Sequence, residues 1–154
     1  MTVNFERLDN FLIDTFKRYG TTTLRISLGV VFLWFGFLKF FPNVSPAETL
    51  ATRTIDVLTF GLIIPSVSVK ILAAWESLIG LGLLTNKFQR VTLFLLWSQM
   101  VGAWSPLVIF PNEMFISFPF VLTLEGQYIV KNLVIIAGSF VLAGMVRNKN
   151  TGEI

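Results

Sequence analysis

The chain has 154 residues, of which 54% are hydrophobic and only 14% are charged, with a net charge of +3 at pH 7. A soluble domain carries about 25% charged residues, so the composition predicts an integral membrane protein that forms one compact domain. The sequence contains no cysteine and no histidine, which excludes a disulfide framework and thiol redox chemistry. Neither haem nor zinc is expected either, since both are usually held by those two residue types.

Residues 4–19 are expected to form an amphipathic helix rather than a membrane span. Their apolar side chains recur at helical spacing and the polar ones lie opposite, with Asp9 as the exception on the apolar face. Such a helix lies in the membrane interface, so residues 1–20 are predicted to be an interfacial anchor. The segment is a poor signal peptide, because its polar lead is long and acidic and no small-residue cleavage site follows.

Four apolar stretches are long enough to cross a bilayer, which takes about 20 mostly apolar residues. The sequence therefore predicts an all-α membrane protein, a bundle of four transmembrane helices preceded by the interfacial helix. The predicted spans are residues 22–41, 67–84, 89–110 and 127–147. Pro106 lies late in the third span and is expected to kink it, because proline cannot donate a backbone hydrogen bond.

The connections between the spans differ in character. Residues 43–65 contain a Ser-Pro-Ala-Glu run that begins at Ser45. This helix-start signature predicts a short amphipathic helix over residues 46–60. The second and third spans are joined by a tight polar turn. Residues 111–126 are apolar but broken by two prolines, so we expect an outer loop that dips into the interface.

The basic residues are distributed unevenly over the two ends of the predicted bundle, and this asymmetry sets the orientation of a membrane protein. One end carries Arg7, Lys17, Arg18, Arg25, Lys87, Arg90, Arg147 and Lys149, and the other carries Lys39, Arg53, Lys70 and Lys131. The richer end is expected to be cytoplasmic. This orientation predicts an inner-membrane protein with both termini in the cytoplasm and a cytoplasmic tail at residues 148–154.

The second span contains one acid, Glu76, close to its centre. A carboxylate there costs several kcal/mol unless it is paired, protonated or facing water. Glu76 therefore marks a functional site or a neutral carboxyl group hydrogen-bonded between helices. We expect Lys39 to form a buried ion pair with it. Helical side chains tilt toward their own N-terminus and the two spans run in opposite directions, so the two side chains converge.

Further polar and aromatic side chains inside the predicted spans are candidates for an intramembrane site. They are Arg25, Gln99, Lys131, Asn132, Trp34, Trp75 and Trp97. A flat ligand with polar tips, such as a quinone head group, suits an aromatic pocket with a few convergent polar groups. Each candidate also has a structural interpretation: snorkelling for Arg25 and Lys131, an interhelical hydrogen bond for Gln99, and core packing for the tryptophans.

Three patterns taken together resemble the DoxX family. The first span, with Arg25, Gly29, Gly36 and Lys39 on one face, resembles the family's Arg…Gly…Gly-x-x-Lys opening. Residues 75–84 resemble its Glu…Gly…Leu-Leu second span, and residues 124–132 resemble the start of its last helix. The resemblance covers about residues 20–146 and implies a four-helix membrane bundle. Members are linked with thiosulfate:quinone oxidoreduction, with membrane complexes of oxidative-stress enzymes and, in distant animal relatives, with receptor assembly.

Two functions remain open from the sequence. One is a membrane subunit that supports quinone-linked redox or oxidative-stress chemistry through a polar, Trp-lined cavity, together with a membrane or peripheral redox protein. The other is a non-catalytic assembly or chaperone subunit that binds partner helices. A small transporter or proton conduit is a third alternative, although four helices are few and no inverted repeat is visible. Whether the chain is an enzyme stays open: it is not expected to be one on its own, and the alternative is an oxidoreductase subunit. Neither a covalent cofactor nor a nucleic acid is expected, and a homo-oligomer stays open.

Overall fold

The computed structural model describes residues 2–42 and 44–151 of the chain, and the side chains of residues 5–42 and 44–146. The elements in chain order are α1 (Thr2–Leu38), α2 (Glu48–Leu58), α3 (Pro65–Thr85), α4 (Gln89–Trp104), α5 (Pro106–Ile109), α6 (Pro111–Met114), β1 (Phe115–Ser117), β2 (Val121–Leu122) and α7 (Leu124–Thr151). Four stretches of this chain are helical, long and apolar enough to cross a membrane. The predicted fold class, an all-α membrane protein with four spanning helices, is therefore confirmed.

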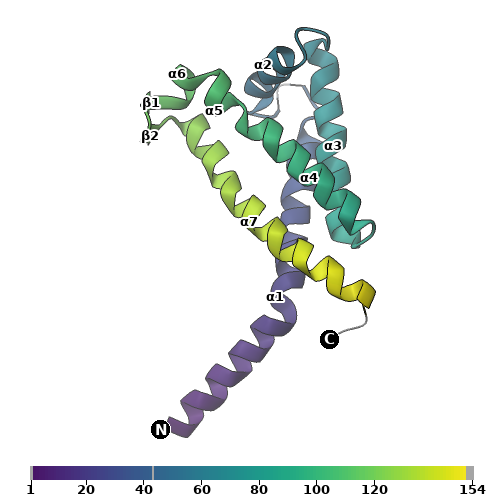
Figure 1. Cartoon of the computed structure of the whole chain (residues 1–154), viewed down its shortest axis with the longest axis vertical. Helices are drawn as coiled ribbons and strands as arrows, with labels where there is room; N and C mark the ends of the chain where they lie inside the picture. Colours follow the sequence, from purple (N-terminus) through teal and green to yellow (C-terminus); the bar gives the residue numbers. More distant parts are fainter. Residues whose placement is uncertain (1, 43, 152–154) are drawn as a thin grey trace.

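The four long helices form a splayed bundle with two distinct ends (Figure 1). The upper end carries α2, α5, α6 and the β1–β2 hairpin, and the lower end carries the α3–α4 turn and the C-terminal part of α7. The predicted tail at 148–154 begins inside α7, which continues to Thr151, and residues 152–154 lie outside the described part of the chain.

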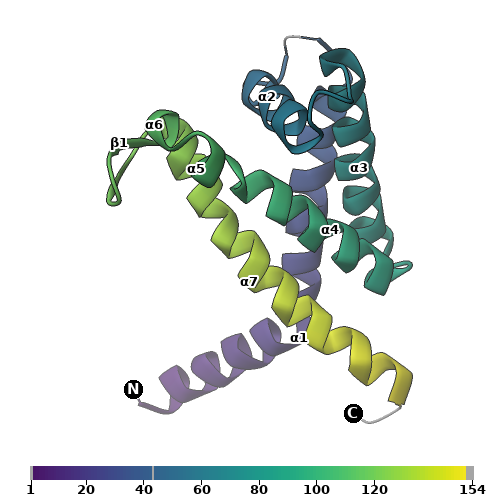
Figure 2. The ribbon, with the colours of Figure 1, turned by 45° about the horizontal axis from the view of Figure 1, so that its top comes forward.

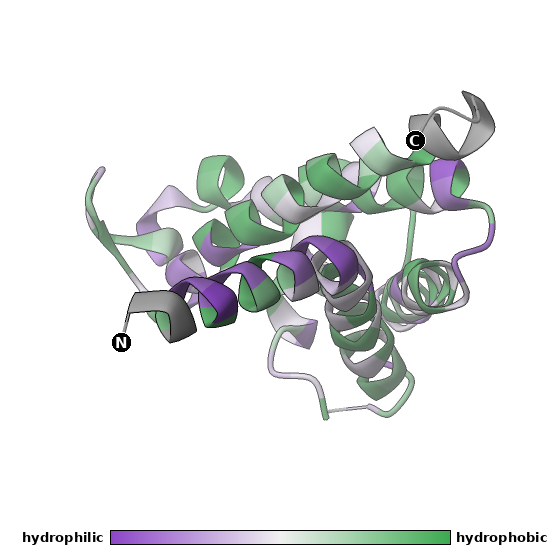
Figure 3. Ribbon diagram, turned by 90° about the horizontal axis from the view of Figure 1, so that it is seen from below, coloured by the Kyte–Doolittle hydropathy of each residue, from purple (hydrophilic) through white to green (hydrophobic). Residues whose placement is uncertain are grey.

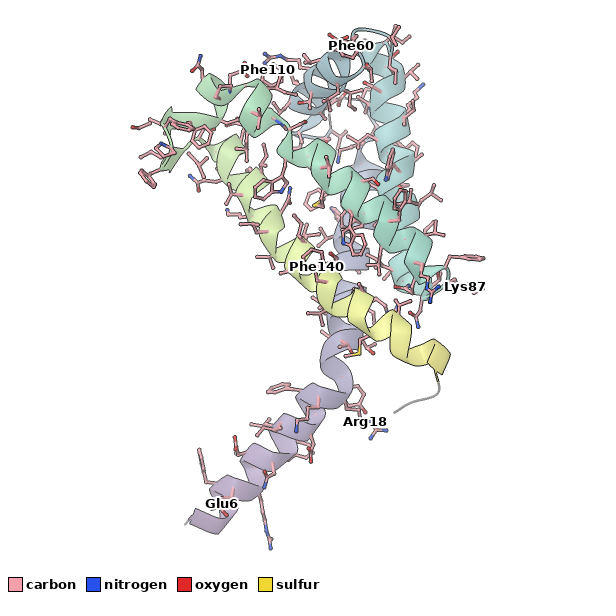
Figure 4. All side chains as sticks on the ribbon, in the orientation of Figure 1. Glu6, Arg18, Phe60, Lys87, Phe110 and Phe140 are labelled. Atoms are coloured by element: carbon pink, nitrogen blue, oxygen red, sulfur yellow. The ribbon has the colours of Figure 1, made fainter. Side chains whose placement is uncertain are left out.

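Helix α1 joins two segments that the sequence predicts as separate helices. It runs from Thr2 to Leu38 and changes direction close to Arg18, so that its first half leaves the bundle as an arm (Figures 2 and 4). The candidate span within it, Phe5–Leu38, has 34 residues and measures about 50 Å at 1.5 Å per residue, whereas the hydrocarbon core is about 30 Å thick. Gly20, followed by three threonines, weakens the helix at this point.

The arm has the surface of an interfacial helix. In Figure 3 strongly hydrophilic and hydrophobic residues alternate along the ribbon of the arm, whereas the long helices of the bundle are mostly hydrophobic. Every side chain from Phe5 to Gly20 is exposed or partly exposed, so the arm is not packed into the core. The prediction that this segment lies in the membrane interface rests on this amphipathic surface and stays a prediction.

Helices α1 and α3 pack closely because glycines stand where they meet. A Cβ on Gly80 would lie 2.5 Å from the backbone nitrogen of Leu33, and a Cβ on Gly36 would lie 2.8 Å from that of Ser77. Small residues let transmembrane helices approach at backbone distance, which is the main source of packing energy where the hydrophobic effect no longer acts between helices. The core that grows from this contact consists of Leu28, Phe32, Ile79, Leu83, Leu93, Leu96, Met100 and Leu142.

Proline shapes the third spanning stretch. Pro106 interrupts the helix rather than bending a continuous one: α4 ends at Trp104, and the short helix α5 begins at Pro106. The other end of α4 follows a three-residue break, 86–88, in which Asn86 and Phe88 have positive φ values of 56° and 50°. These residues reverse the chain so that α4 runs back along α3.

The upper end is more ordered than the predicted outer loop over 111–126. Residues there form α6 and an antiparallel pair of strands in which Phe115 faces Leu122 and Ser117 faces Val121. Thr123 then begins the last helix, because its Oγ1 accepts a hydrogen bond from the Gly126 N–H at 3.2 Å. The predicted helix after Ser45 is also present as α2, but its N-cap residue is Ala47 and no side chain caps it.

Candidate functional site

An ion pair lies between the end of α1 and the middle of α3. Lys39, in the turn after α1, places its Nζ 2.6 Å from Oε2 of Glu76, and the two side chains are only 7% and 9% exposed. Lys39 reaches this position by leaning back along its helix, where its Nζ also lies 3.4 Å from the Phe35 carbonyl oxygen. The predicted buried pair is therefore confirmed, and it links two spans within the bundle.

A third helix completes this arrangement. The Nε2 of Gln99, on α4, donates a hydrogen bond of 2.9 Å to Oε1 of Glu76. Both carboxylate oxygens of Glu76 thus have a donor, one charged and one neutral, as a buried carboxylate requires. Gly36 makes room for the network, because a Cβ there would lie 2.9 Å from the Cβ of Glu76. We call these three residues, Lys39, Glu76 and Gln99, the polar network.

The polar network contains one acceptor without a partner. Oε1 of Gln99 is buried and has no hydrogen bond. Its position follows from the chemistry of the amide: Nε2 must face the carboxylate, so Oε1 has to point elsewhere. Ser77 Oγ and Trp104 Nε1 are likewise buried without a partner. Buried polar atoms that lack a protein partner usually form a hydrogen bond with an ordered water molecule or a ligand.

The sequence left the tryptophans to line one pocket or to pack in the core, and the structure gives them separate surroundings. Trp34 is 65% exposed and faces outward from the bundle. The indole N–H of Trp75 donates to the Leu95 carbonyl at 3.0 Å, and that of Trp97 donates to Ser139 Oγ at 2.8 Å. Helical periodicity places residues on a face but does not fix which neighbour they meet, so the sequence could not distinguish these partners. Trp104, absent from the predicted set, is the tryptophan whose buried N–H has no partner.

The other predicted site residues lie apart from the polar network. Arg25 is at the lower end, where its Nη1 donates to the carbonyl oxygens of Leu83 and Leu84 at the end of α3. A cation in this position complements the negative end of the helix dipole. Lys131 is exposed and holds its Nζ 5.1 Å from the centre of the Tyr128 ring. Asn132 is half-buried on α7.

The side chains of the polar network can bind and exchange a proton. None of the three, a lysine, a glutamate and a glutamine, can carry an electron. An ammonium and a carboxylate 2.6 Å apart hold a proton between two atoms that can exchange it. Within the described residues no three acidic side chains form a group that could hold a metal ion. What the arrangement can do unaided is hold a polar ligand and supply or accept a proton.

Comparison with known proteins gives one match. The sequence model of the DoxX family matches residues 20–111, a stretch that begins near the bend of α1 and includes all three residues of the polar network. The pattern at residues 124–132 lies beyond it. No curated protein and no solved structure matches the chain.

Proposed function

The chain belongs to the DoxX family, and from that premise we propose that it is a membrane subunit of a quinone-linked redox system. The observation that carries the proposal is the buried polar network, in which Oε1 of Gln99 is held in place and has no partner. A buried polar atom without a hydrogen bond lowers the stability of the folded protein. Intramembrane ionisable groups beside such an atom are functional sites by default.

The unpartnered atoms suit the two forms of a quinone head group. A quinone supplies two-electron chemistry coupled to two protons, with carbonyl oxygens when oxidised and hydroxyl groups when reduced. Oε1 of Gln99 would accept a hydrogen bond from a hydroxyl group, and the buried Nε1–H of Trp104 on the same helix is a donor for a carbonyl. Glu76 and Lys39 would hold and exchange the proton.

Electrons in this proposal come from a partner. The chain contains no cysteine and no histidine, so a membrane or peripheral redox protein would have to deliver them. The distribution of charge supports an orientation with the lower end in the cytoplasm: the bundle's basic residues at that end include Arg25, Lys87 and Arg90. Under this proposal the protein lies in the inner membrane with both termini inside.

Quinone binding is testable with the intact chain in lipid nanodiscs, with a short-chain benzoquinone as the probe and tryptophan fluorescence as the signal. We expect saturable quenching whose apparent affinity falls about tenfold in Gln99→Leu, the loss of roughly one buried hydrogen bond to a polar ligand. Gln127→Leu is the matched control, because Gln127 is exposed at the start of α7. Non-saturating quenching, or equal affinities in both variants, would contradict the proposal.

The exposed arm of α1 favours assembly as a second candidate function. An amphipathic helix with every described side chain from Phe5 to Gly20 at least partly exposed is available to a partner as well as to lipid. If the protein is an assembly subunit, deletion of residues 1–18 abolishes co-purification of its partner and leaves the bundle inserted. If the arm is an anchor only, the partner is retained after the deletion.

A further inference from the structure

A cavity of about 500 Å³ lies at the lower end, apart from the polar network. Residues from α1, the α3–α4 turn, the start of α4 and the last part of α7 line it. Its polar lining includes Thr22, Arg25, Asn86 and Arg90, and none of the described lining residues is acidic. The cavity is therefore bordered by three spanning helices, and no carboxylate among its described lining residues balances its positive charge.

Arg25 is held in place at this cavity before any ligand arrives. Both of its hydrogen bonds, to the carbonyl oxygens of Leu83 and Leu84, come from Nη1. A guanidinium has five N–H donors, and with the two on Nη1 in use three remain, on Nη2 and Nε, so a second group can be bound without breaking the link to α3. A guanidinium fixed by one face and free to donate from the other is suited to a planar or tetrahedral oxyanion.

Arg90 provides the second positive charge. It is exposed in the first turn of α4, across the cavity wall from α1. That turn also has no side-chain cap, so the backbone N–H groups at its start add to the positive potential. Two arginines from different helices thus contribute to a single cavity, and the helix start strengthens their attraction for an anion.

The remaining wall of the cavity is apolar and lies at the level where the spans end. It includes Phe88, Val91, Leu142, Met145 and Val146. A soluble phosphate would leave this surface unused, whereas a lipid would cover it with an acyl chain. Basic pockets between transmembrane helices are typical binding sites for anionic lipid head groups.

We propose that this cavity binds an anionic phospholipid, with the phosphate between Arg25 and Arg90 and an acyl chain against α7. The lipid would brace the lower end, where α7 meets α1 and the α3–α4 turn. A free phosphate ion carries the same oxyanion as the lipid head group. The apolar wall of the cavity favours the lipid, because only a lipid has an acyl chain to cover it.

Native mass spectrometry of the full chain in detergent tests this, with phosphatidylglycerol and phosphatidylcholine titrated separately at fixed ionic strength. We expect one phosphatidylglycerol to bind at least tenfold more tightly than phosphatidylcholine. Arg90→Gln should weaken phosphatidylglycerol binding about fivefold to tenfold, as expected for one cation at a lipid phosphate, and Arg90→Lys should restore most of it. Arg25 is left unchanged because it also binds the end of α3.

Lys87→Gln is the matched control, since Lys87 lies three residues before Arg90, in the α3–α4 turn, and is exposed but does not line the cavity (Figure 4). It should leave the affinity within about twofold of the unmodified chain. Equal binding of the two lipids would show that the negative charge is not recognised, and equal losses in Arg90→Gln and Lys87→Gln would show diffuse attraction. Either result would overturn the proposal. Displacement of the lipid by inorganic phosphate at an equal concentration would overturn the assignment to a lipid.

Discussion

Lys39 and Glu76 stabilise the bundle only while both are present, because either one alone is an uncompensated charge in a low-dielectric interior. The pair is also short, at 2.6 Å, and is continued by Gln99. Replacing a whole buried pair with apolar groups is often close to neutral, whereas removing one partner is strongly destabilising. The polar network is therefore weak evidence for stability and better evidence for a retained function.

The first prediction is a strong coupling between Lys39 and Glu76. Lys39→Met and Glu76→Gln should each lower the free energy of unfolding by about 3–5 kcal/mol, and the double variant should lose much less than the sum of the two. Thermal unfolding of the three variants in one detergent measures this. Additive effects would show that the two side chains do not depend on one another.

The second prediction concerns the exposed pair at the upper end. Arg53 binds both carboxylate oxygens of Glu113 at 2.8 Å, and these hydrogen bonds lower the pKa of Glu113 below its usual value. A lowered pKa means that the link is complete above the ordinary glutamate pKa of about 4.3 and is lost as the pH falls through the lower value. Carbon-13 NMR titration of Glu113 measures this, and in Arg53→Gln its pKa should rise. An unchanged titration would mean that the guanidinium is not the cause.

At the scale of the elements, the contact between α1 and α3 determines whether the polar network can form. Gly36 and Gly80 bring the two backbones together, and only at that separation does Lys39 reach the middle of α3. The sequence allowed this contact to be predicted in outline, because Arg25, Gly29, Gly36 and Lys39 share one face of the first span. It could not show how close the approach is, since separation depends on both helices at once.

The third prediction tests this contact. Gly80→Ala should destabilise the bundle by about 1–3 kcal/mol, because its Cβ would lie 2.5 Å from the Leu33 backbone nitrogen and force the helices apart. Gly144→Ala is the control: nothing lies within 4 Å of its Cβ, and alanine in a helix is favoured over glycine by about 0.5–1 kcal/mol. Thermal unfolding in detergent should shift in opposite directions. Equal shifts would mean that the close approach carries no energetic weight.

Other elements show where sequence patterns stop being informative. The four spans were predictable because length and hydropathy alone decide whether a helix can cross a bilayer. The β1–β2 hairpin was missed, since strands of three and two residues are too short to show alternation. Trp75 and Trp97 were candidates for a shared pocket or for core packing, and the sequence could not show that their hydrogen-bond partners lie on different helices. Contacts between helices depend on rotation about each axis, which composition does not specify.

At the scale of the whole molecule, the two ends differ in charge and in structure. The lower end has basic side chains and a cavity, and the upper end has short helices, a hairpin and paired charges. This difference underlies the proposed orientation. The chain has no cysteine, so single-cysteine variants report on each end without further engineering.

The fourth prediction is that the upper end faces outward. In intact cells an impermeant maleimide should label Asn112→Cys, which lies in α6, and should leave Lys87→Cys unlabelled until the membrane is permeabilised. Both positions are exposed, so access is limited by the membrane and not by burial. The reverse pattern would invert the orientation, and labelling of both positions in intact cells would contradict the number of spans.

The ion pair also imposes an order on biogenesis. Glu76 follows Lys39 by 37 residues, so at about 5–20 residues per second the ribosome delivers the lysine roughly 2–7 seconds earlier. Lys39 waits at the end of α1, where its long side chain reaches the head groups. The shorter side chain of Glu76 cannot reach the head groups from the centre of its span. A charged residue at that depth raises the apparent free energy of translocon insertion by about 2.5–3.5 kcal/mol. By this order of synthesis Lys39 would already be in place when Glu76 reaches the translocon, and a chain that lost α1 and Lys39 would insert α3 with no base to receive its acid.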